Sequence, residues 1–116
     1  MTLTLIHNGT LIDGNGGKPV ADGALLIDGS RIIAAGPLDA LDVPADATRI
    51  DAGGGTILPG LIDTHVHIAL EFTSLIEIAS MPFSLRFYKA IQYMQRTIEA
   101  GITTVRDAGG ADLGMK

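Results

Sequence analysis

Up to about Gly55, apolar positions come in short runs that glycine-rich turns interrupt. The runs TLTLIHN, GALLIDGSRIIAAG and TRIDA are separated by turn residues such as DGNGG and followed by GGG. Runs of this length, bounded by Gly, Asn and Asp, are typical of β-strands. Asp28-Gly29 lies between two apolar segments, which predicts a tight hairpin with a type I′ turn. Residues 37–47, PLDALDVPADA, predict a surface connection or a short helical turn. This part of the chain is therefore predicted to be a β-rich module.

After Gly55 the pattern changes to strand, helix and strand. TILPGLIDTHVHI, residues 56–68, is almost continuously apolar, which predicts a strand buried on both faces, as in a parallel sheet or barrel. Residues 84–100 place apolar side chains at helical spacing, and Gly101 is placed to end that helix. ITTVRDAGG, residues 102–110, predicts a second strand. This order is a βαβ unit, which implies a parallel pair. The apolar positions of the helix, predicted to be core, are Phe87, Tyr88, Ile91, Met94 and Ile98.

Composition restricts the function classes. A chain of 116 residues has room for one modest domain, or for two pieces that depend on something else. Hydrophobic residues make up 47% of it, which argues against disorder. The net charge of -5 leaves no basic surface for nucleic acid. Without cysteine, any metal must be held by histidine, carboxylate or water, and a cytoplasmic location is expected. Neither a signal peptide nor a membrane span is predicted.

His65 and His67 lie one residue apart near the end of the apolar strand. Side chains at i and i+2 of a strand point to the same face, about 6.6 Å apart, so two imidazoles can bind one ion. Asp63 belongs to the same face, where a carboxylate could accept the second N–H of a ligating histidine. The alternative is that the pair is structural, because His-x-His arises by chance in roughly one such sequence in twenty. Its place at the C-terminal end of a parallel strand favours a metal site.

The two strand segments resemble sequences of a known family. LPGLIDTHVHI is similar to the first barrel strand of the amidohydrolase superfamily, and GITTVRDAGG to the second strand of its imidazolonepropionase-like and Xaa-Pro dipeptidase-like branch. IHNGTLIDGNG and ALLIDGSRIIAAG resemble the N-terminal half of the small β-sandwich of these enzymes. The resemblance implies an α/β fold. Residues 1–56 would be the N-terminal part of the β-sandwich, and residues 57–116 would be the start of a (β/α)8 TIM-type barrel, with strand 1, helix 1 and strand 2.

The resemblance also implies a chemistry. His65 and His67 would bind a divalent metal, usually zinc, with one or two ions in the complete enzyme. The metal would activate a water for hydrolysis of an amide or cyclic amide C–N bond. The family needs further ligands and a general base from later strands, namely a lysine, two histidines and an aspartate. The chain lacks these, and His7 is expected to be an ordinary strand residue. We therefore expect the chain alone to have no catalytic residue and not to be a competent hydrolase.

The missing strands imply partners. A barrel that stops after two strands exposes an edge and an apolar face. The expected partner is the remainder of the barrel, in a longer or cleaved chain, or a second copy through self-association. The expected substrate is a small amide or peptide-like molecule, with no nucleic acid and no membrane. The alternative function is a non-catalytic, oligomerising assembly module. A small β-rich binding domain with structural histidines is the third interpretation.

Further residues are candidates for a substrate pocket. Arg106 and Asp107, at the end of the second strand, either face a substrate or have ordinary roles. In the second case Asp107 caps the next turn and Arg106 pairs with a carboxylate. Residues 69–83 would form the first βα loop, which shapes the pocket in barrel enzymes. The candidates in that loop, with loop packing as their ordinary role, are Glu71, Phe72, Met81 and Phe83.

Overall fold

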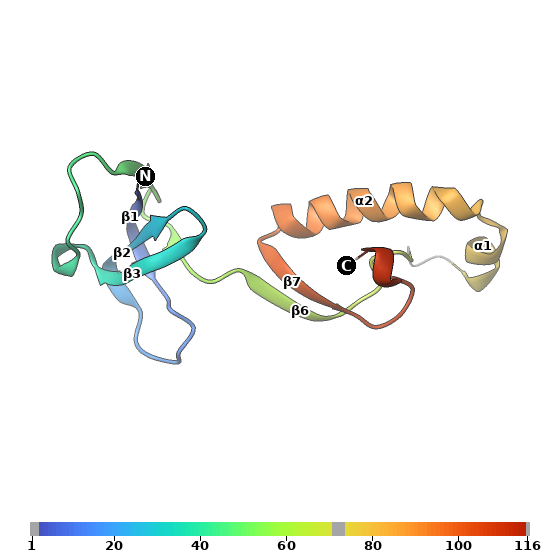
Figure 1. Ribbon diagram of the computed structural model, residues 1–116. Coiled ribbons are helices and arrows are strands. Elements are labelled where there is room, and N and C mark those ends of the chain that lie inside the picture. Colours follow the sequence, from blue (N-terminus) through green and yellow to red (C-terminus); the bar gives the residue numbers. More distant parts are fainter. Residues whose placement is uncertain (1–2, 71–73, 116) are drawn as a thin grey trace. The chain divides into compact units, whose positions relative to one another are not determined.

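The computed structural model describes residues 3–70 and 74–115, and the chain divides into two units. The first unit ends at Pro59 and the second begins at Gly60. Figure 1 shows the first unit as a set of strands and the second as two strands with helices. The division falls after residue 59 rather than after residue 56. The reason is that β5 (Thr56–Ile57) pairs with β1 (Thr4–Leu11) of the first unit.

The first unit is a mixed five-stranded sheet in the order β3-β2-β1-β4, with β5 also paired to β1. Neighbouring strands β1, β2 and β3 run antiparallel, whereas β4 and β5 lie parallel to β1. A 3-10 helix, η1, follows β3 directly. The remaining bounds are β2 (Val20–Asp28), β3 (Arg31–Pro37), η1 (Leu38–Ala40) and β4 (Thr48–Asp51).

The predicted hairpin is present as β2 and β3, but the predicted turn type is wrong. Asp28 pairs with Arg31, so the central residues of the turn are Gly29 and Ser30. Gly29 has a φ of +57°, and Ser30 does not have a positive φ. A type I′ turn requires positive φ at both central residues, whereas a type II′ turn requires it only at the first. The turn is therefore of the type II′ kind, with glycine at its first central position.

The core of the first unit lies on one face of the sheet. Leu5, Ala24 and Leu26 form a buried cluster, and Leu5 is 0% exposed. These positions alternate along β1 and β2, as expected when one face of a sheet packs inward. The segment after β3, predicted to be a surface connection, contributes apolar side chains to this cluster. The half-buried residues packed against it are Leu3, Ala34, Leu38, Leu41 and Val43.

The second unit contains the predicted βαβ arrangement. Its two strands, β6 (Leu61–Val66) and β7 (Ile102–Asp107), pair in parallel, and the helix α2 (Phe83–Glu99) contacts β7. The prediction of one continuous strand over residues 56–68 is wrong, because β5 and β6 are separate strands of different units. The break falls at residues 58–60, because Pro59 has no N–H to donate to a strand ladder.

The loop predicted between the first strand and the helix contains a short helix of its own, α1 (Leu75–Ser80). Ser74 caps it: the Glu77 N–H donates to Ser74 Oγ at 3.3 Å, and the Ser74 N–H donates to Glu77 Oε2 at 3.2 Å. This reciprocal pair is a capping box, and its sequence signal is Ser-x-x-Glu ahead of an apolar run. The signal is present in the sequence, but the prediction for residues 69–83 is a loop. A second short helix, η2 (Leu113–Met115), follows β7.

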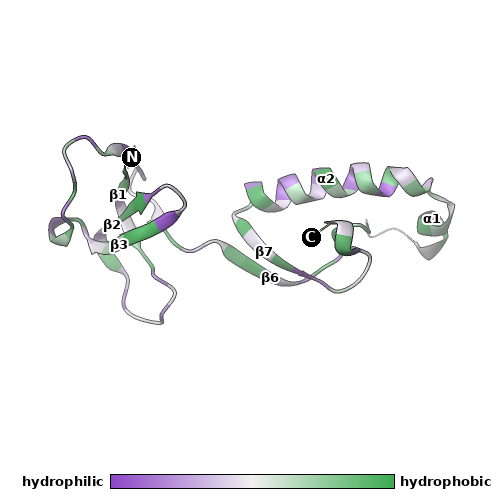
Figure 2. Cartoon of the chain, in the orientation of Figure 1, coloured by the Kyte–Doolittle hydropathy of each residue, from purple (hydrophilic) through white to green (hydrophobic). Residues whose placement is uncertain are grey.

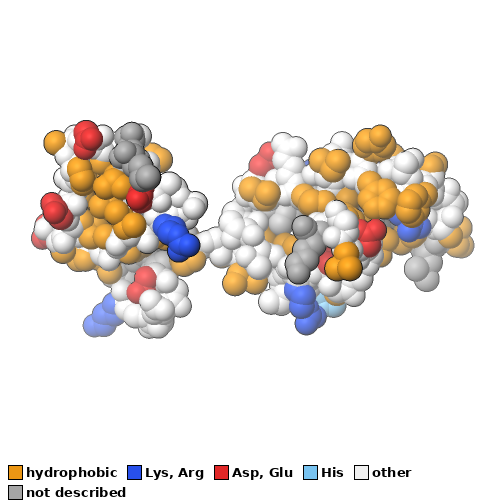
Figure 3. Space-filling view, in the orientation of Figure 1, with side chains coloured by type: hydrophobic (Ala, Val, Ile, Leu, Met, Phe, Trp, Pro, Cys, Tyr) orange, Lys and Arg blue, Asp and Glu red, His pale blue; other side chains and the backbone are white. Residues whose placement is uncertain are grey.

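The prediction that five apolar residues of α2 are core is wrong for three of them. Phe87 and Met94 are half-buried, and they flank the fully buried Ala90. The exposed three, with their exposed fractions, are Tyr88 (70%), Ile91 (60%) and Ile98 (67%). Each lies one residue after a buried or half-buried position of α2, so its side chain is turned by about 100° around the helix axis. Figure 2 shows apolar positions around α2, and Figure 3 shows hydrophobic side chains gathered over it. In the residues described, no helix combines the length and apolar character that crossing a membrane needs.

Candidate metal site

The end of β6 brings together His65, which lies in the strand, and His67, which follows its last residue. The centroids of their rings lie 5.4 Å apart, with an angle of 74° between the ring planes. The alternation of a strand, which sends every second side chain to the same face, accounts for this placement. The end of β6 is held against β7, because the Ala108 N–H donates to the Val66 carbonyl at 2.8 Å. The pair therefore lies where the carboxyl ends of two parallel strands meet.

The hydrogen bond of His67 fixes the state of its ring. Its Nδ1 lies 2.8 Å from the carbonyl oxygen of Gly109. A carbonyl oxygen can only accept a hydrogen bond, so Nδ1 carries the proton. In the neutral imidazole the lone pair then resides on Nε2. This is the arrangement of metal-binding histidines, in which one ring nitrogen is anchored to the protein and the other faces the ion.

Asp63 contacts the backbone of His65 rather than an imidazole. Its Oδ1 accepts a hydrogen bond from the His65 N–H at 3.0 Å. The carboxylate is half-buried and lies two residues before the histidine, as the strand period requires. The sequence predicts that Asp63 fixes a histidine tautomer, whereas its hydrogen bond in the structure fixes the backbone next to that histidine.

Asp107 accepts three backbone hydrogen bonds at the end of β7. The Ile68 N–H donates to Oδ2 at 2.8 Å, while the N–H groups of Gly109 and Ala111 donate to Oδ1 at 2.7 and 3.4 Å. Burial by itself would raise the pKa of the Asp107 carboxyl group. The three backbone hydrogen bonds, helped by the nearby His67, outweigh burial and lower that pKa below its ordinary value. Asp107 is therefore a carboxylate at neutral pH.

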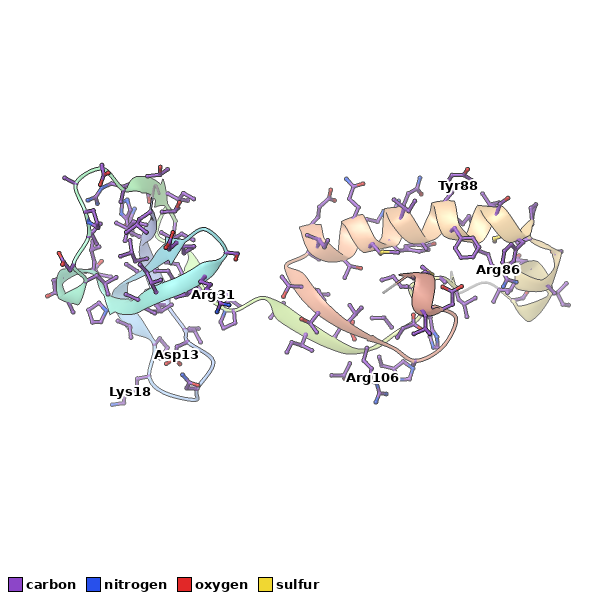
Figure 4. The ribbon with its side chains drawn as sticks, in the orientation of Figure 1. Asp13, Lys18, Arg31, Arg86, Tyr88 and Arg106 are labelled. Carbon is purple, nitrogen blue, oxygen red and sulfur yellow. The ribbon has the colours of Figure 1, made fainter. Side chains whose placement is uncertain are left out.

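Arg106 and Asp107 both line a hollow of about 960 Å³ at the end of β7. Ile68 and Val105 contribute to its wall, together with residues of the segment that ends in η2. Arg106 is exposed, and its side chain extends from β7 on the side away from α2 (Figure 4).

The loop candidates are spread over different environments. Met81 is half-buried, whereas Phe83 is 74% exposed and packs edge-on against Phe87, with ring centroids 5.1 Å apart. Glu71 and Phe72 lie outside the residues that the structure describes. Arg86 joins α2 to α1, because its Nη2 donates to the Ile78 carbonyl at 2.7 Å. Tyr88 points away from the strands (Figure 4).

The described residues contain no group of three His, Cys, Asp or Glu side chains that could hold a metal ion. The third histidine, His7, lies on β1 in the first unit. The chemistry of the pair nevertheless fits a divalent metal such as zinc, because two neighbouring imidazoles on one strand supply two of the three or four ligands that zinc takes. What sequence reasoning missed is the backbone of Ile68 and Gly109. The sequence signal for these backbone contacts is Asp-Ala-Gly-Gly, which begins at the last residue of β7.

Comparison with known proteins places these residues in a family. The sequence model of the Amidohydrolase family matches residues 56–116. The chain is 31% identical over 111 residues to an enamidase of Eubacterium barkeri, covering 94% of this chain and 26% of the enamidase. It is 40% identical over 91 residues to an imidazolonepropionase of Paracoccus denitrificans, covering 67% of this chain and 22% of that protein.

A solved structure agrees with these relatives. The crystal structure of a Xaa-Pro dipeptidase with bound methionine superposes with a TM-score of 0.78 at 33% identity, over 97% of this chain and 28% of that one. The chain thus spans about a quarter of the length of each of these three proteins. The resemblance predicted from LPGLIDTHVHI and GITTVRDAGG is confirmed. The matched family model covers both strands and the histidine pair, and the chain belongs to the amidohydrolase family.

Proposed function

We propose that this chain forms the N-terminal part of a metal-dependent amidohydrolase that hydrolyses amide or cyclic amide C–N bonds. The observation that carries the proposal is the neighbouring pair of His65 and His67 at the carboxyl end of β6, with Nδ1 of His67 bonded to the Gly109 carbonyl. The names of the relatives, among them an imidazolonepropionase and a Xaa-Pro dipeptidase, support this reaction class. The substrate would be a small amide or a peptide-like molecule.

The proposed architecture has two parts. The first unit would be the N-terminal part of a small β-sandwich, and the βαβ arrangement of β6, α2 and β7 would begin a (β/α)8 barrel. The remainder of the barrel would supply the further metal ligands and the general base. The chain therefore has a proposed partner, which is the rest of the same barrel in a longer or cleaved chain. We expect the protein to work in the cytoplasm and to bind neither nucleic acid nor membrane.

His65 and His67 would hold a divalent metal, zinc by their donor chemistry. When bound, such a metal polarises a carbonyl and lowers the pKa of a water to near neutrality. In this proposal the other residues of this chain orient the two histidines. The Gly109 carbonyl accepts a hydrogen bond from Nδ1–H of His67, so that Nε2 carries the lone pair, and Asp63 holds the backbone of His65. Arg106 lines the adjacent hollow, and in this proposal its guanidinium would bind an anionic group of a substrate.

The experiment that tests this function uses the complete gene product that carries this chain. Hydrolysis of Xaa-Pro dipeptides and cyclic amides is measured before chelation, after chelation and after zinc is restored. We expect activity to be lost with the metal and regained with it. The double variant His65→Ala/His67→Ala should lower kcat/KM by more than about 100-fold, because both imidazoles are ligands.

The matched control is His7→Ala, which removes the histidine of the first unit and should leave activity close to wild type. The proposal fails if the double variant keeps its metal and its activity. It also fails if the wild-type protein hydrolyses these substrates equally well after chelation.

A further inference from the structure

The carboxylate of Asp107 joins the two ends of the parallel strand pair. Oδ2 accepts from the N–H of Ile68, the residue directly after His67, at 2.8 Å. Oδ1 accepts from the N–H of Gly109, in the segment that follows β7, at 2.7 Å. One rigid carboxylate therefore fixes the backbone next to His67 and the backbone of Gly109 relative to each other.

Gly109 in turn contacts the ring of His67. Its carbonyl oxygen lies 2.8 Å from Nδ1. Gly109 has a φ of +152°, a conformation that side-chain-bearing residues rarely adopt, and a Cβ there would lie 3.9 Å from the imidazole. Three hydrogen bonds thus form a closed circuit. They join Asp107 to Gly109, Gly109 to the His67 ring, and Ile68 to Asp107, and the peptide bond between His67 and Ile68 closes the circuit.

We propose that Asp107 is a positioning residue for His67. Asp107 sets the orientation of the His67 imidazole through the Gly109 carbonyl and the Ile68 N–H. This proposal rests on the proposed function, in which His67 binds the metal. Asp107 acts on the ring through these backbone groups. A neutral imidazole held in this way presents Nε2 in one fixed direction.

The chemistry of the circuit calls for a carboxylate. Both oxygens of Asp107 accept hydrogen bonds from N–H groups. Asparagine has one acceptor oxygen and an NH₂ group that can only donate. In Asp107→Asn the NH₂ group would therefore point at a backbone N–H, and that hydrogen bond would be lost. Glutamate keeps both acceptors but moves them by one methylene, which misplaces them relative to Ile68 and Gly109. Asp107→Asn therefore breaks the circuit with little change in side-chain volume.

The proposal is tested in the complete gene product with zinc as the probe. The dissociation constant for zinc is measured by competition with a chelating dye in wild type, Asp107→Asn and Asp51→Asn. We expect Asp107→Asn to weaken zinc binding by about 10- to 100-fold, the range for partners that orient metal-binding histidines. Asp51 is the matched control, because it also accepts from the N–H two residues later, that of Gly53 at 2.7 Å, but lies in the first unit. Asp51→Asn should keep the wild-type affinity.

A second readout separates positioning from a merely structural role. In ¹⁵N-histidine-labelled, metal-free protein, the His67 ring should be the single tautomer with its proton on Nδ1, and Asp107→Asn should shift its nitrogen signals toward a mixture of tautomers. In steady-state kinetics, Asp107→Asn with saturating zinc should lower kcat and leave KM unchanged. A variant that raises KM with unchanged zinc affinity indicates direct contact with substrate and overturns the proposal.

The two proposals can fail separately. If wild type binds zinc through His67 but Asp107→Asn has wild-type affinity and wild-type His67 signals, the positioning role of Asp107 is wrong and the metal function stands. If wild type binds no zinc, the proposed function fails. If Asp107→Asn does not fold, the wild-type spectrum still decides, because a proton on Nε2 of His67 would overturn the circuit without any variant.

Discussion

The two units of the chain hold their residues in place by different means. The first unit buries apolar side chains against one another, and those of Leu5, Leu11, Ala24, Leu26, Ala47 and Ile57 are buried. In the second unit, the buried apolar residues among those described are Ala69 and Ala90. Large apolar side chains there stay exposed, such as Ile62 at 67% and Ile76 at 79%. The unit with the histidines is thus ordered at its site by backbone hydrogen bonds to Asp63 and Asp107, while its apolar faces lack cover.

The largest expected difference concerns local stability in the 116-residue chain. Amide hydrogens of β1 and β2 should exchange at least about 10³-fold more slowly than those of β6 and β7, because the buried cluster of Leu5, Ala24 and Leu26 lies on β1 and β2 and its opening costs several kcal/mol. Hydrogen exchange followed by NMR measures both sets in one sample. Equal protection in the two units would contradict the comparison.

Truncating one apolar residue in each unit sharpens the comparison. Leu5→Ala should lower the free energy of unfolding by about 3 kcal/mol, since it leaves a cavity at a fully buried position. Ile91→Ala, on the exposed stripe of α2, should change it by less than about 0.5 kcal/mol. Urea unfolding of both variants provides the values.

The Ile91→Ala variant also tests what covers α2. In the complete gene product, the cost of Ile91→Ala should rise above about 1 kcal/mol if the remainder of the barrel covers this stripe. A cost that stays near zero there would mean that the stripe is solvent-exposed in the whole protein as well.

A close backbone approach at the start of β6 gives the next effect. A Cβ at Gly60 would overlap the side chain of Thr103 on β7. Gly60→Ala should therefore destabilise the pairing of β6 with β7 by about 1 to 3 kcal/mol, as overpacking does. Gly17→Ala is the control, because a Cβ there would meet nothing within 4 Å. Chemical-shift changes in β7 should appear only in the Gly60 variant, and their absence would show that the strands can move apart freely.

The sequence predicts the elements better than it predicts their surroundings. The β2–β3 hairpin, the parallel pair of β6 and β7 and the position of α2 follow from turn chemistry and from hydrophobic period, which act over a few residues. These local signals do not predict the break between β5 and β6 at residues 58–60. They also do not predict that three apolar side chains of α2 are exposed, those of Tyr88, Ile91 and Ile98. Both features depend on which elements pack against each face, and the apolar pattern of a segment does not determine which element packs against it.

The candidate site shows the same limit. The spacing of His65 and His67 suffices to put both rings on one side, since a strand has a period of two. The backbone partners of Asp107 cannot be predicted in this way. Ile68 and Gly109 are separated by 41 positions in the chain and meet only because β6 and β7 pair in parallel.

The smallest expected effect is a pH dependence in the first unit. A hydrogen bond from the Gly53 N–H, then one from Asn8 Nδ2, and the charge of His7 lower the pKa of Asp51 below its ordinary value of 3.8. Since the folded-state pKa is the lower one, the stabilisation is complete above the ordinary value and is lost as the pH falls through the folded-state pKa. Urea midpoints measured from pH 6 downwards should fall less steeply for Asp51→Asn than for wild type. Identical slopes would contradict this assignment.

The central claim is that His65 and His67 are metal ligands held at the end of β6. Zinc content and X-ray absorption of the complete gene product, measured beside the variants His65→Ala/His67→Ala and His7→Ala, test it most directly. The account predicts bound zinc with nitrogen ligands at about 2.0 to 2.1 Å in wild type and in His7→Ala, and its loss in the double variant. Zinc retained by the double variant with an unchanged spectrum, or absent from wild type, would contradict it.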